Sequence, residues 1–385
     1  MSAARMATAG AVVLALVGVA SAAVRPGRLR GFDVDAFGHL PVLDGGRLKP
    51  IDSLARNSLL VIRGRQGFAF ERRSVSADEW LLEVLFRGEV ADRQPIFVID
   101  DPDVLGLLGL RQTSERYHSF QVLEPHLQEI QRQANSARAI DGKLRTRFQA
   151  AIVNLFDRLV LYWKLRNTVQ LGQAPLEAEI EARNGPGAVQ RQESLAKLAA
   201  FRPVPPPGGG DQWLSVGEAL QAARSAPLDP AFEPLASLAS SWDAQDAARF
   251  NRAVADLRSA IGARQPEALS RADSECLFNR AQPFYAGLVI YVVSLLVLFT
   301  SWLWKRELLQ PAAFGLLAAG ALVHTAGLVA RILLQGRPPV TNLYSSAVFV
   351  GWSAVVLGIV LEQLYRRGFV TAIAAAAGSA SLIIA

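Results

Sequence analysis

Five long apolar segments constrain the fold of this chain more than any other feature of its sequence. They contain no Asp, Glu, Lys or Arg, and they occupy residues 7–24, 283–304, 311–330, 343–361 and 369–385. About 20 such residues cross the hydrocarbon core of a bilayer as an α-helix. We therefore expect a membrane protein in which four of these segments are spanning helices. The last segment has 17 residues and ends without a polar flank, so we expect the sequence to be the front part of a longer chain.

The first segment has two interpretations, a membrane anchor or a cleaved secretory signal. Arg5 precedes the apolar run, and Ala20 and Ala22 are small residues of the kind found at a signal cleavage site. We weigh the two interpretations equally and assign residues 1–30 to this part of the chain. In both, the residues that follow are delivered to the far side of the membrane.

A polar block, residues 31–280, is long enough for one or two soluble domains. Asp44-Gly45-Gly46 predicts a tight turn between two short apolar pieces, and residues 95–100 predict a short buried strand. Helical spacing of apolar residues predicts a helix over 51–62 and further helices over 119–171 and 214–270.

Three shorter patterns refine this picture of the polar block. Ser76 and Glu79 form a capping box at the start of a helix. Residues 148–165 are strongly apolar but too interrupted by charge to span a membrane, so we expect a buried helix of the soluble domain. The Pro- and Gly-rich residues 201–213 predict a linker near 203–211.

Charge and motif content exclude several classes of function. The net charge of +6 is explained by basic residues next to membrane helices, and no basic run interleaved with aromatic residues indicates a nucleic-acid partner. The single cysteine, Cys276, excludes an internal disulfide and is expected to be a buried small apolar residue. The histidines have no metal-site or triad spacing, and no phosphate-binding loop is present, so we find no catalytic set.

His324 is the only histidine within the apolar segments, which contain no charged residue type. A polar ring in a membrane helix is costly unless it has a partner, so it is a site hypothesis by default. Two roles stay equally open. His324 is either an axial ligand of haem iron or a hydrogen-bonding partner of a neighbouring helix, which Gly320 and Gly327 would allow to approach closely.

The loop "GRPPVTNLYSS", residues 336–346, is stiff and polar. Its two prolines fix φ and push Arg337 toward extended geometry, and Thr341 or Asn342 can cap the next helix. Arg331 lies seven residues after His324 and so on nearly the same helix face. Arg331 and Arg337 are either interfacial anchors or partners for the carboxylates of an anionic ligand.

The residues "RILLQGRPPVTNLYSSAVFVGW" (331–352) resemble the loop and helix of the CcsA-type cytochrome c assembly proteins of system II biogenesis. The earlier "FGHLPVLDGGRLKPIDSLAR" (37–56) resembles the exported domain of the fused form of that family. The resemblance implies a mainly α, polytopic helical membrane protein with a mostly helical periplasmic domain that contains a few short strands. Residues 281–385 would hold the first four helices of the membrane core, in a bacterial inner membrane.

The function implied by the resemblance is transport of b-type haem across the membrane and its presentation to apocytochrome c. His324 would contact the iron, Arg331 and Arg337 would hold the haem propionates, and Asn342 would shape the loop. A partner subunit of the ResB/CcsB type is also implied, and the chain would be part of a haem-attaching synthase. The tryptophan-rich haem segment of the family is absent, because the seven Trp residues are scattered. Two alternatives remain: a transporter or channel for a small anionic solute, and a non-catalytic membrane scaffold.

Overall fold

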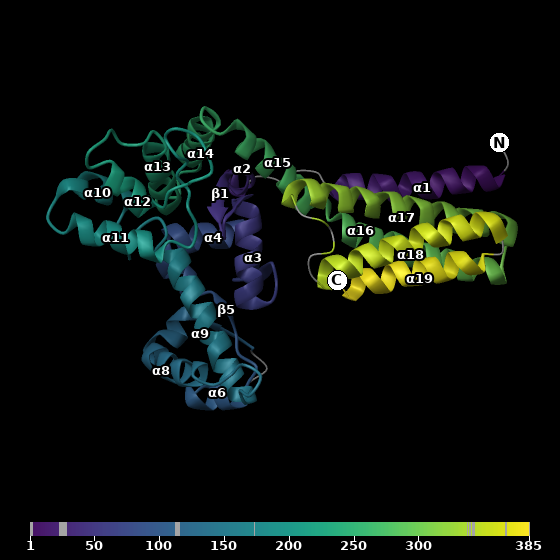
Figure 1. The fold of residues 1–385 in the computed structure, drawn as a ribbon, viewed down its shortest axis with the longest axis horizontal. Helices are drawn as coiled ribbons and strands as arrows, with labels where there is room; N and C mark the ends of the chain where they lie inside the picture. Colours follow the sequence, from purple (N-terminus) through teal and green to yellow (C-terminus); the bar gives the residue numbers. More distant parts are fainter. Residues whose placement is uncertain are drawn as a thin grey trace. The chain divides into compact units, whose positions relative to one another are not determined.

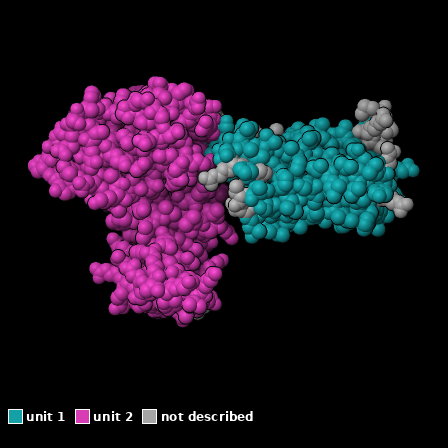
Figure 2. Space-filling model, viewed as in Figure 1, with its two compact units in different colours: residues 1–25, 274–385 teal, residues 26–273 magenta. Residues whose placement is uncertain are grey.

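The computed structural model describes residues 3–22, 29–111, 116–172, 174–336, 338, 340, 343–365 and 368–384. The chain divides into two compact units, which Figure 2 shows in different colours. Unit 1 consists of residues 1–25 and 274–385, and unit 2 of residues 26–273. The chain is mainly helical, with a few short strands, as expected.

Unit 1 is a bundle of apolar helices whose long axes run side by side (Figure 1). The helices are α1 (Ala3–Ala22), α16 (Pro283–Leu303), α17 (Arg306–Gln335), α18 (Leu343–Tyr365) and α19 (Phe369–Ile384). Three stretches of the described chain are long and apolar enough to cross a membrane, namely Pro266–Leu303, Arg306–Gln335 and Leu343–Tyr365. Four spanning helices were expected, and the described residues contain three. The shorter apolar helices among these residues are Thr8–Val19 and Phe369–Ile384.

Small residues let the helices of unit 1 approach closely. A Cβ built on Gly315 of α17 would lie 2.5 Å from Cγ2 of Thr8, so α1 packs directly on α17 at this glycine. A Cβ built on Gly358 of α18 would lie 2.4 Å from Cβ of Ala374 on α19. Contacts between small residues are the usual basis of helix association in lipid, where burial of apolar surface gives no preference for protein over acyl chains.

Unit 2 is mostly helical. Its helices are α2 (Val34–Gly38), α3 (Ile51–Arg63), α4 (Ala77–Phe86), α5 (Gly88–Ala91), α6 (Pro102–Leu107), α7 (Phe120–Leu123), η1 (Glu124–His126), α8 (Leu127–Arg138), α9 (Arg147–Arg166), α10 (Leu176–Glu181), η2 (Ala182–Asn184), α11 (Ala188–Leu198), α12 (Val216–Ala222), α13 (Phe232–Asp243) and α14 (Ala247–Gly262). Helix α15 (Pro266–Ala281) begins in unit 2 and continues the chain into α16. Buried Cys276 lies on α15, as expected of a small apolar residue.

The strands of unit 2 form three antiparallel pairs. These are β1 (Pro41–Asp44) with β2 (Arg47–Pro50), β3 (Gly67–Phe70) with β4 (Arg73–Ser76), and β5 (Pro95–Val98) with β6 (Tyr117–Ser119). The turn predicted at residues 44–46 is confirmed, since Gly45 and Gly46 both have positive φ and join β1 to β2. The strand predicted over 95–100 is also confirmed, with Ile96 and Phe97 fully buried.

The predicted helix over 148–165 is α9, which buries Ile152, Leu159 and Tyr162 in the core of unit 2. The capping box at Ser76 is confirmed in one direction only. The Ser76 hydroxyl accepts from the backbone N–H of Glu79 at 3.2 Å, whereas the Glu79 carboxylate pairs with Arg73.

The Pro- and Gly-rich residues 201–213, expected to form a linker, lie wholly within unit 2. Phe201 and Trp213 at their two ends are buried in its core, and Val204 forms a backbone bridge with Leu214. The segment is therefore a loop that folds back on itself within one unit, because its flanking aromatic residues anchor both ends.

Candidate functional site

His324 lies inside the helix bundle of unit 1, on α17, and its exposed fraction is 0%. The hydroxyl of Tyr291 on α16 is 3.2 Å from Nδ1 of the imidazole. The ring of Phe284, also on α16, meets the imidazole edge to face, with 5.8 Å between ring centroids. The backbone carbonyl of Val348 on α18 lies within reach of an imidazole N–H as well. Three helices thus surround this one polar ring.

Tyr291 is held between two glycines from different helices. A Cβ on Gly320 of α17 would lie 2.6 Å from Cε1 of the tyrosine ring, and a Cβ on Gly378 of α19 would lie 2.9 Å from Cε2. Neither position has room for a side chain while the ring keeps its place. We call Gly320, Tyr291 and Gly378 the tyrosine clamp; it fixes the phenol that faces His324.

The expected approach of a neighbouring helix at Gly320 and Gly327 is confirmed. Gly320 admits Tyr291, and a Cβ on Gly327 would lie 3.1 Å from Cε1 of Phe284. The hydrogen bond between α16 and α17 therefore satisfies Nδ1 of His324. This role as a packing partner does not use the second ring nitrogen.

Nε2 of His324 is buried and completes no hydrogen bond within the described part of the chain. A hydroxyl can either donate or accept, so Tyr291 can partner both neutral tautomers of the imidazole. When Nδ1 carries the proton and donates to Tyr291, Nε2 presents a lone pair, which is the form that binds a metal. The donor atom of an iron ligand is therefore present.

The space around the His324 imidazole determines whether a haem could reach Nε2. Four cavities are lined by described residues, and His324 borders none of these four. The imidazole suits iron by its chemistry, but a porphyrin could reach Nε2 only if the packing of Phe284 or α18 around the ring opened. In the described residues, no group of three or more His, Cys, Asp or Glu side chains could hold a metal ion.

Arg331 lies two helical turns beyond His324, about 10 Å further along the axis of α17. Its guanidinium carbon is 4.4 Å from the centre of the Tyr344 ring on α18, a cation–π contact. Its Nε is buried and makes no hydrogen bond to the described residues. The other two predicted site residues, Arg337 and Asn342, lie outside the described residues, so only His324 and Arg331 can be placed.

Glu362, near the end of α18, is a buried carboxylate that the sequence analysis missed. Its exposed fraction is 6%, and its two oxygens accept hydrogen bonds from the backbone N–H groups of Gly368, at 2.6 Å, and Thr371, at 3.0 Å. It thereby satisfies the N-terminus of α19. The sequence held a signal for this role, because a carboxylate precedes an apolar helix by a few residues.

A cavity of about 740 Å³ adjoins Glu362. Residues at the start of α17, the end of α18 and the start of α19 line it, including Arg306, Glu307 and Gln310. Among the described residues, two carboxylates and one guanidinium border this space, so the cavity is polar.

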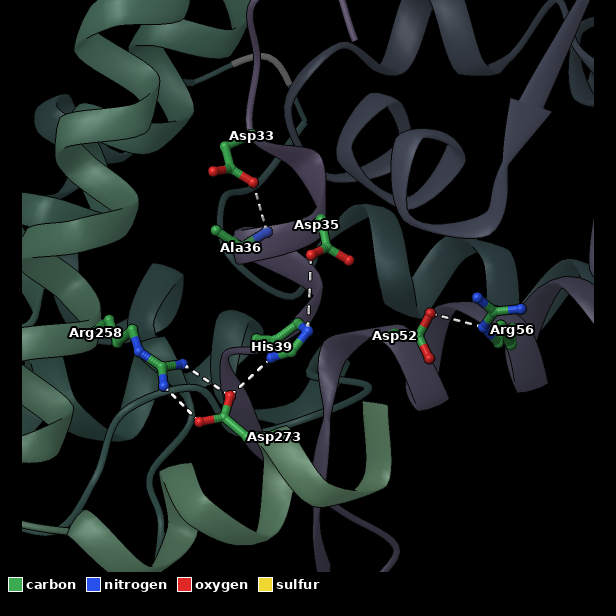
Figure 3. A network of polar contacts seen from close by, with 8 residues as sticks. All are labelled: Asp33, Asp35, Ala36, His39, Asp52, Arg56, Arg258 and Asp273. Atoms are coloured by element: carbon green, nitrogen blue, oxygen red, sulfur yellow. Dashed lines mark hydrogen bonds and ion pairs between the residues drawn. The ribbon is translucent and has the colours of Figure 1, made fainter. Parts of the chain in front are cut away.

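Unit 2 contains a polar network around His39 (Figure 3). Nδ1 of His39 is 2.7 Å from Oδ1 of Asp273, and Nε2 is 3.9 Å from Oδ2 of Asp35. Arg258 donates to both oxygens of Asp273, at 3.2 and 2.6 Å. Burial alone would raise the pKa of Asp273, but the hydrogen bonds from Arg258 and His39 lower it. The network ties α2, α14 and α15 together and explains why His39 is buried with charged neighbours.

A second carboxyl group lies close to this network. Burial, together with the charge of Asp52, raises the pKa of Asp78 well above its ordinary value of 3.8. Asp52 itself binds Arg56 at 2.6 Å. Asp78 consequently keeps its proton to a higher pH than an exposed aspartate does.

The fold and these sites define a helical membrane protein with a second, mostly helical unit. No family model matches the chain. A stretch of 86 residues, 22% of this chain, is 33% identical to the cytochrome c biogenesis protein CcsA of Synechocystis sp. (strain ATCC 27184 / PCC 6803 / Kazusa). The matched stretch covers 26% of that protein, so the chain spans about a quarter of this relative. The similarity links the chain to cytochrome c biogenesis at this coarse level.

Proposed function

We propose that this protein acts in cytochrome c biogenesis by carrying b-type haem through the membrane and presenting it to apocytochrome c. The observation that carries the proposal is the buried imidazole of His324, whose Nε2 has no hydrogen-bond partner in the described residues. The similarity to the CcsA protein of Synechocystis supports a role in cytochrome c biogenesis. Haem is the cargo in this proposal, held in transit by the chain.

In this proposal His324 binds the haem iron through Nε2, while Nδ1 donates to the hydroxyl of Tyr291. A protonated second nitrogen with a fixed acceptor is the usual arrangement around a metal-bound histidine. Arg331 is a partner for a haem propionate, since its guanidinium lies along the same helix and its Nε is unpaired. Arg337 would take the second propionate, and Asn342 would shape the loop between α17 and α18.

The setting follows from the same proposal. Unit 2 would lie in the periplasm, the helices of unit 1 in the bacterial inner membrane, and a ResB/CcsB-type subunit would be the partner. Because His324 is enclosed, haem uptake requires movement of the packing around the imidazole. The alternative is transport of a small anionic solute; among the described residues, the cavity at Arg306 also presents Glu307 and Glu362.

The test is the haem content of the purified full chain and its variants. The wild type, expressed in haem-replete cells, is expected to show a Soret band that His324→Ala removes, while His126→Ala in unit 2 keeps it. A colourless wild type, or a His324→Ala protein with an unchanged haem-to-protein ratio, would contradict the proposal.

A further inference from the structure

A small polar cavity lies within unit 2, far along the sequence from His324. Its volume is about 260 Å³, and its lining comes from α4, α5, α13, the β3–β4 turn and the turn at residues 29–32. Residues that matter for its chemistry are Arg30, Glu83, Arg93, Gln94 and Trp242. The cavity has room for a small molecule rather than for one water alone.

Gln94 is the strongest sign that the cavity is a binding site. Its exposed fraction is 1%, yet neither its amide oxygen nor its amide nitrogen has a hydrogen-bond partner among the described residues. Buried polar groups in folded proteins are almost always paired, so a doubly unpaired amide that lines a cavity needs an explanation. A bound molecule with both a donor and an acceptor would supply it.

Glu83 and Trp242 also line the cavity, and they lie close enough for Nε1 of Trp242 to donate to the Glu83 carboxylate. The atoms without a partner among the described residues therefore include the acceptor and the donor of the Gln94 amide. A purely hydrophobic ligand or a simple ion would leave some of them unsatisfied.

Some charged residues of the cavity pair with each other, whereas others at the rim do not. Arg73 pairs with Glu79, and Arg87 lies 3.4 Å from Glu83. Arg30 and Arg93, which are exposed at the rim, have no carboxylate partner among the described residues. The rim thus offers guanidinium groups to an anion, while the interior offers acceptors to an N–H donor.

Backbone conformation around the cavity is also unusual. Arg30, Glu71 and Gln245 line it, and each has a positive φ, of 48°, 48° and 57° respectively. Non-glycine residues in this region cost energy and concentrate at binding and catalytic sites. The strain agrees with the unpaired atoms but does not by itself specify a ligand.

We propose that this cavity binds a small molecule in which a carboxylate lies next to an N–H donor. That chemistry belongs to the α-carboxylate of a free amino acid and to the last residue of a peptide. The carboxylate would contact Arg30 and Arg93 at the rim, and the N–H would donate to Gln94 or Glu83 inside. This site is independent of the haem proposal.

The experiment uses the full chain in detergent micelles and three probes, L-alanine, N-acetyl-L-alanine and L-alaninamide, with binding followed by saturation-transfer NMR and calorimetry. Saturable binding of alanine, of N-acetylalanine or of both is expected, with alaninamide at least about tenfold weaker because it lacks the carboxylate. Alanine alone would indicate a free amino acid as ligand, and N-acetylalanine alone a peptide end.

Variants connect the binding to the cavity. Arg93→Gln changes an exposed residue and is expected to weaken binding at least about tenfold, as expected for loss of a hydrogen bond to a charged group. Gln94→Leu should remove binding while raising thermal stability, because it deletes an unpaired amide. Arg132→Gln on α8 is the matched control and should bind as the wild type does. Absence of saturable binding by every probe, or equal binding by Arg93→Gln, would overturn the proposal and leave the cavity as a water site.

Discussion

Gly320→Ala tests the tyrosine clamp at the point where the helices of unit 1 have least room. The new Cβ would lie 2.6 Å from Cε1 and 2.8 Å from Cδ1 of Tyr291. The ring cannot move away freely, because a Cβ on Gly378 would already be within 2.9 Å of its other edge. Either the phenol leaves His324, or α16 and α17 separate.

The size of the effect follows from two contributions. Overpacking a well-packed core costs about 1–3 kcal/mol. Losing the buried hydrogen bond between Tyr291 and His324 adds roughly 1 kcal/mol, and better helix propensity offsets up to about 1 kcal/mol. The net expectation is a loss of roughly 1–3 kcal/mol, or about 5- to 150-fold in the unfolding equilibrium.

The assay is unfolding of the purified full chain in mixed micelles with an increasing fraction of sodium dodecyl sulfate. Gly287→Ala on α16 is the matched control, since its Cβ would have only an ordinary contact, 3.7 Å from Cδ1 of Leu382. The control should stay within about 0.5 kcal/mol of the wild type. Equal unfolding midpoints for Gly320→Ala and Gly287→Ala would refute the clamp.

Three further outcomes are expected. Tyr291→Phe keeps the ring between its glycines but removes the hydroxyl. It should lower the haem-to-protein ratio measured by absorption spectroscopy, while the free energy of unfolding in micelles falls by only about 0.5–1.5 kcal/mol. Unchanged haem content would show that the Tyr291 hydroxyl takes no part in haem binding. Glu362→Gln weakens the cap on α19 and should cost about 0.5–2 kcal/mol, with faster amide exchange at Gly368 and Thr371 as the readout and unchanged exchange as the contrary result. The pKa of Asp78 is raised in the folded state, so this group ionises first in the unfolded chain and stability falls as pH rises above 3.8. Asp78→Asn should therefore raise the melting temperature at pH 7 but not at pH 4. An equal change in melting temperature at both pH values would argue against a raised pKa.

Local sequence patterns predicted much of the secondary structure of this chain correctly. The β1–β2 turn follows from two glycines that tolerate positive φ, and α9 follows from regular apolar spacing interrupted by charge. The loop at 201–213 was misjudged because its composition resembles a linker, whereas the burial of Phe201 and Trp213 depends on contacts distant in sequence. Composition reports local stiffness and says little about which side chains the rest of the chain will cover.

The candidate site, too, could be predicted only where its residues stand out locally in the sequence. His324 could be singled out because it is a lone imidazole in an apolar helix, and its packing against a neighbouring helix was one of the two roles expected. Its partner Tyr291 and the second glycine of the clamp, Gly378, come from other helices, and no spacing in the sequence pairs them. Gln94 could not be found from the sequence for a related reason, since only the folded unit shows that its amide is buried and has no partner among the described residues.

The central claim is that Nε2 of His324 binds haem iron, and chemical rescue tests it most directly. In His324→Gly, the missing imidazole leaves a space that free imidazole can occupy. We expect the purified variant to lack a Soret band without imidazole and to recover it when imidazole is added during haem loading, with no recovery in the presence of an inert ring of similar size such as cyclopentane. A variant that retains the full haem-to-protein ratio without added imidazole would contradict the account.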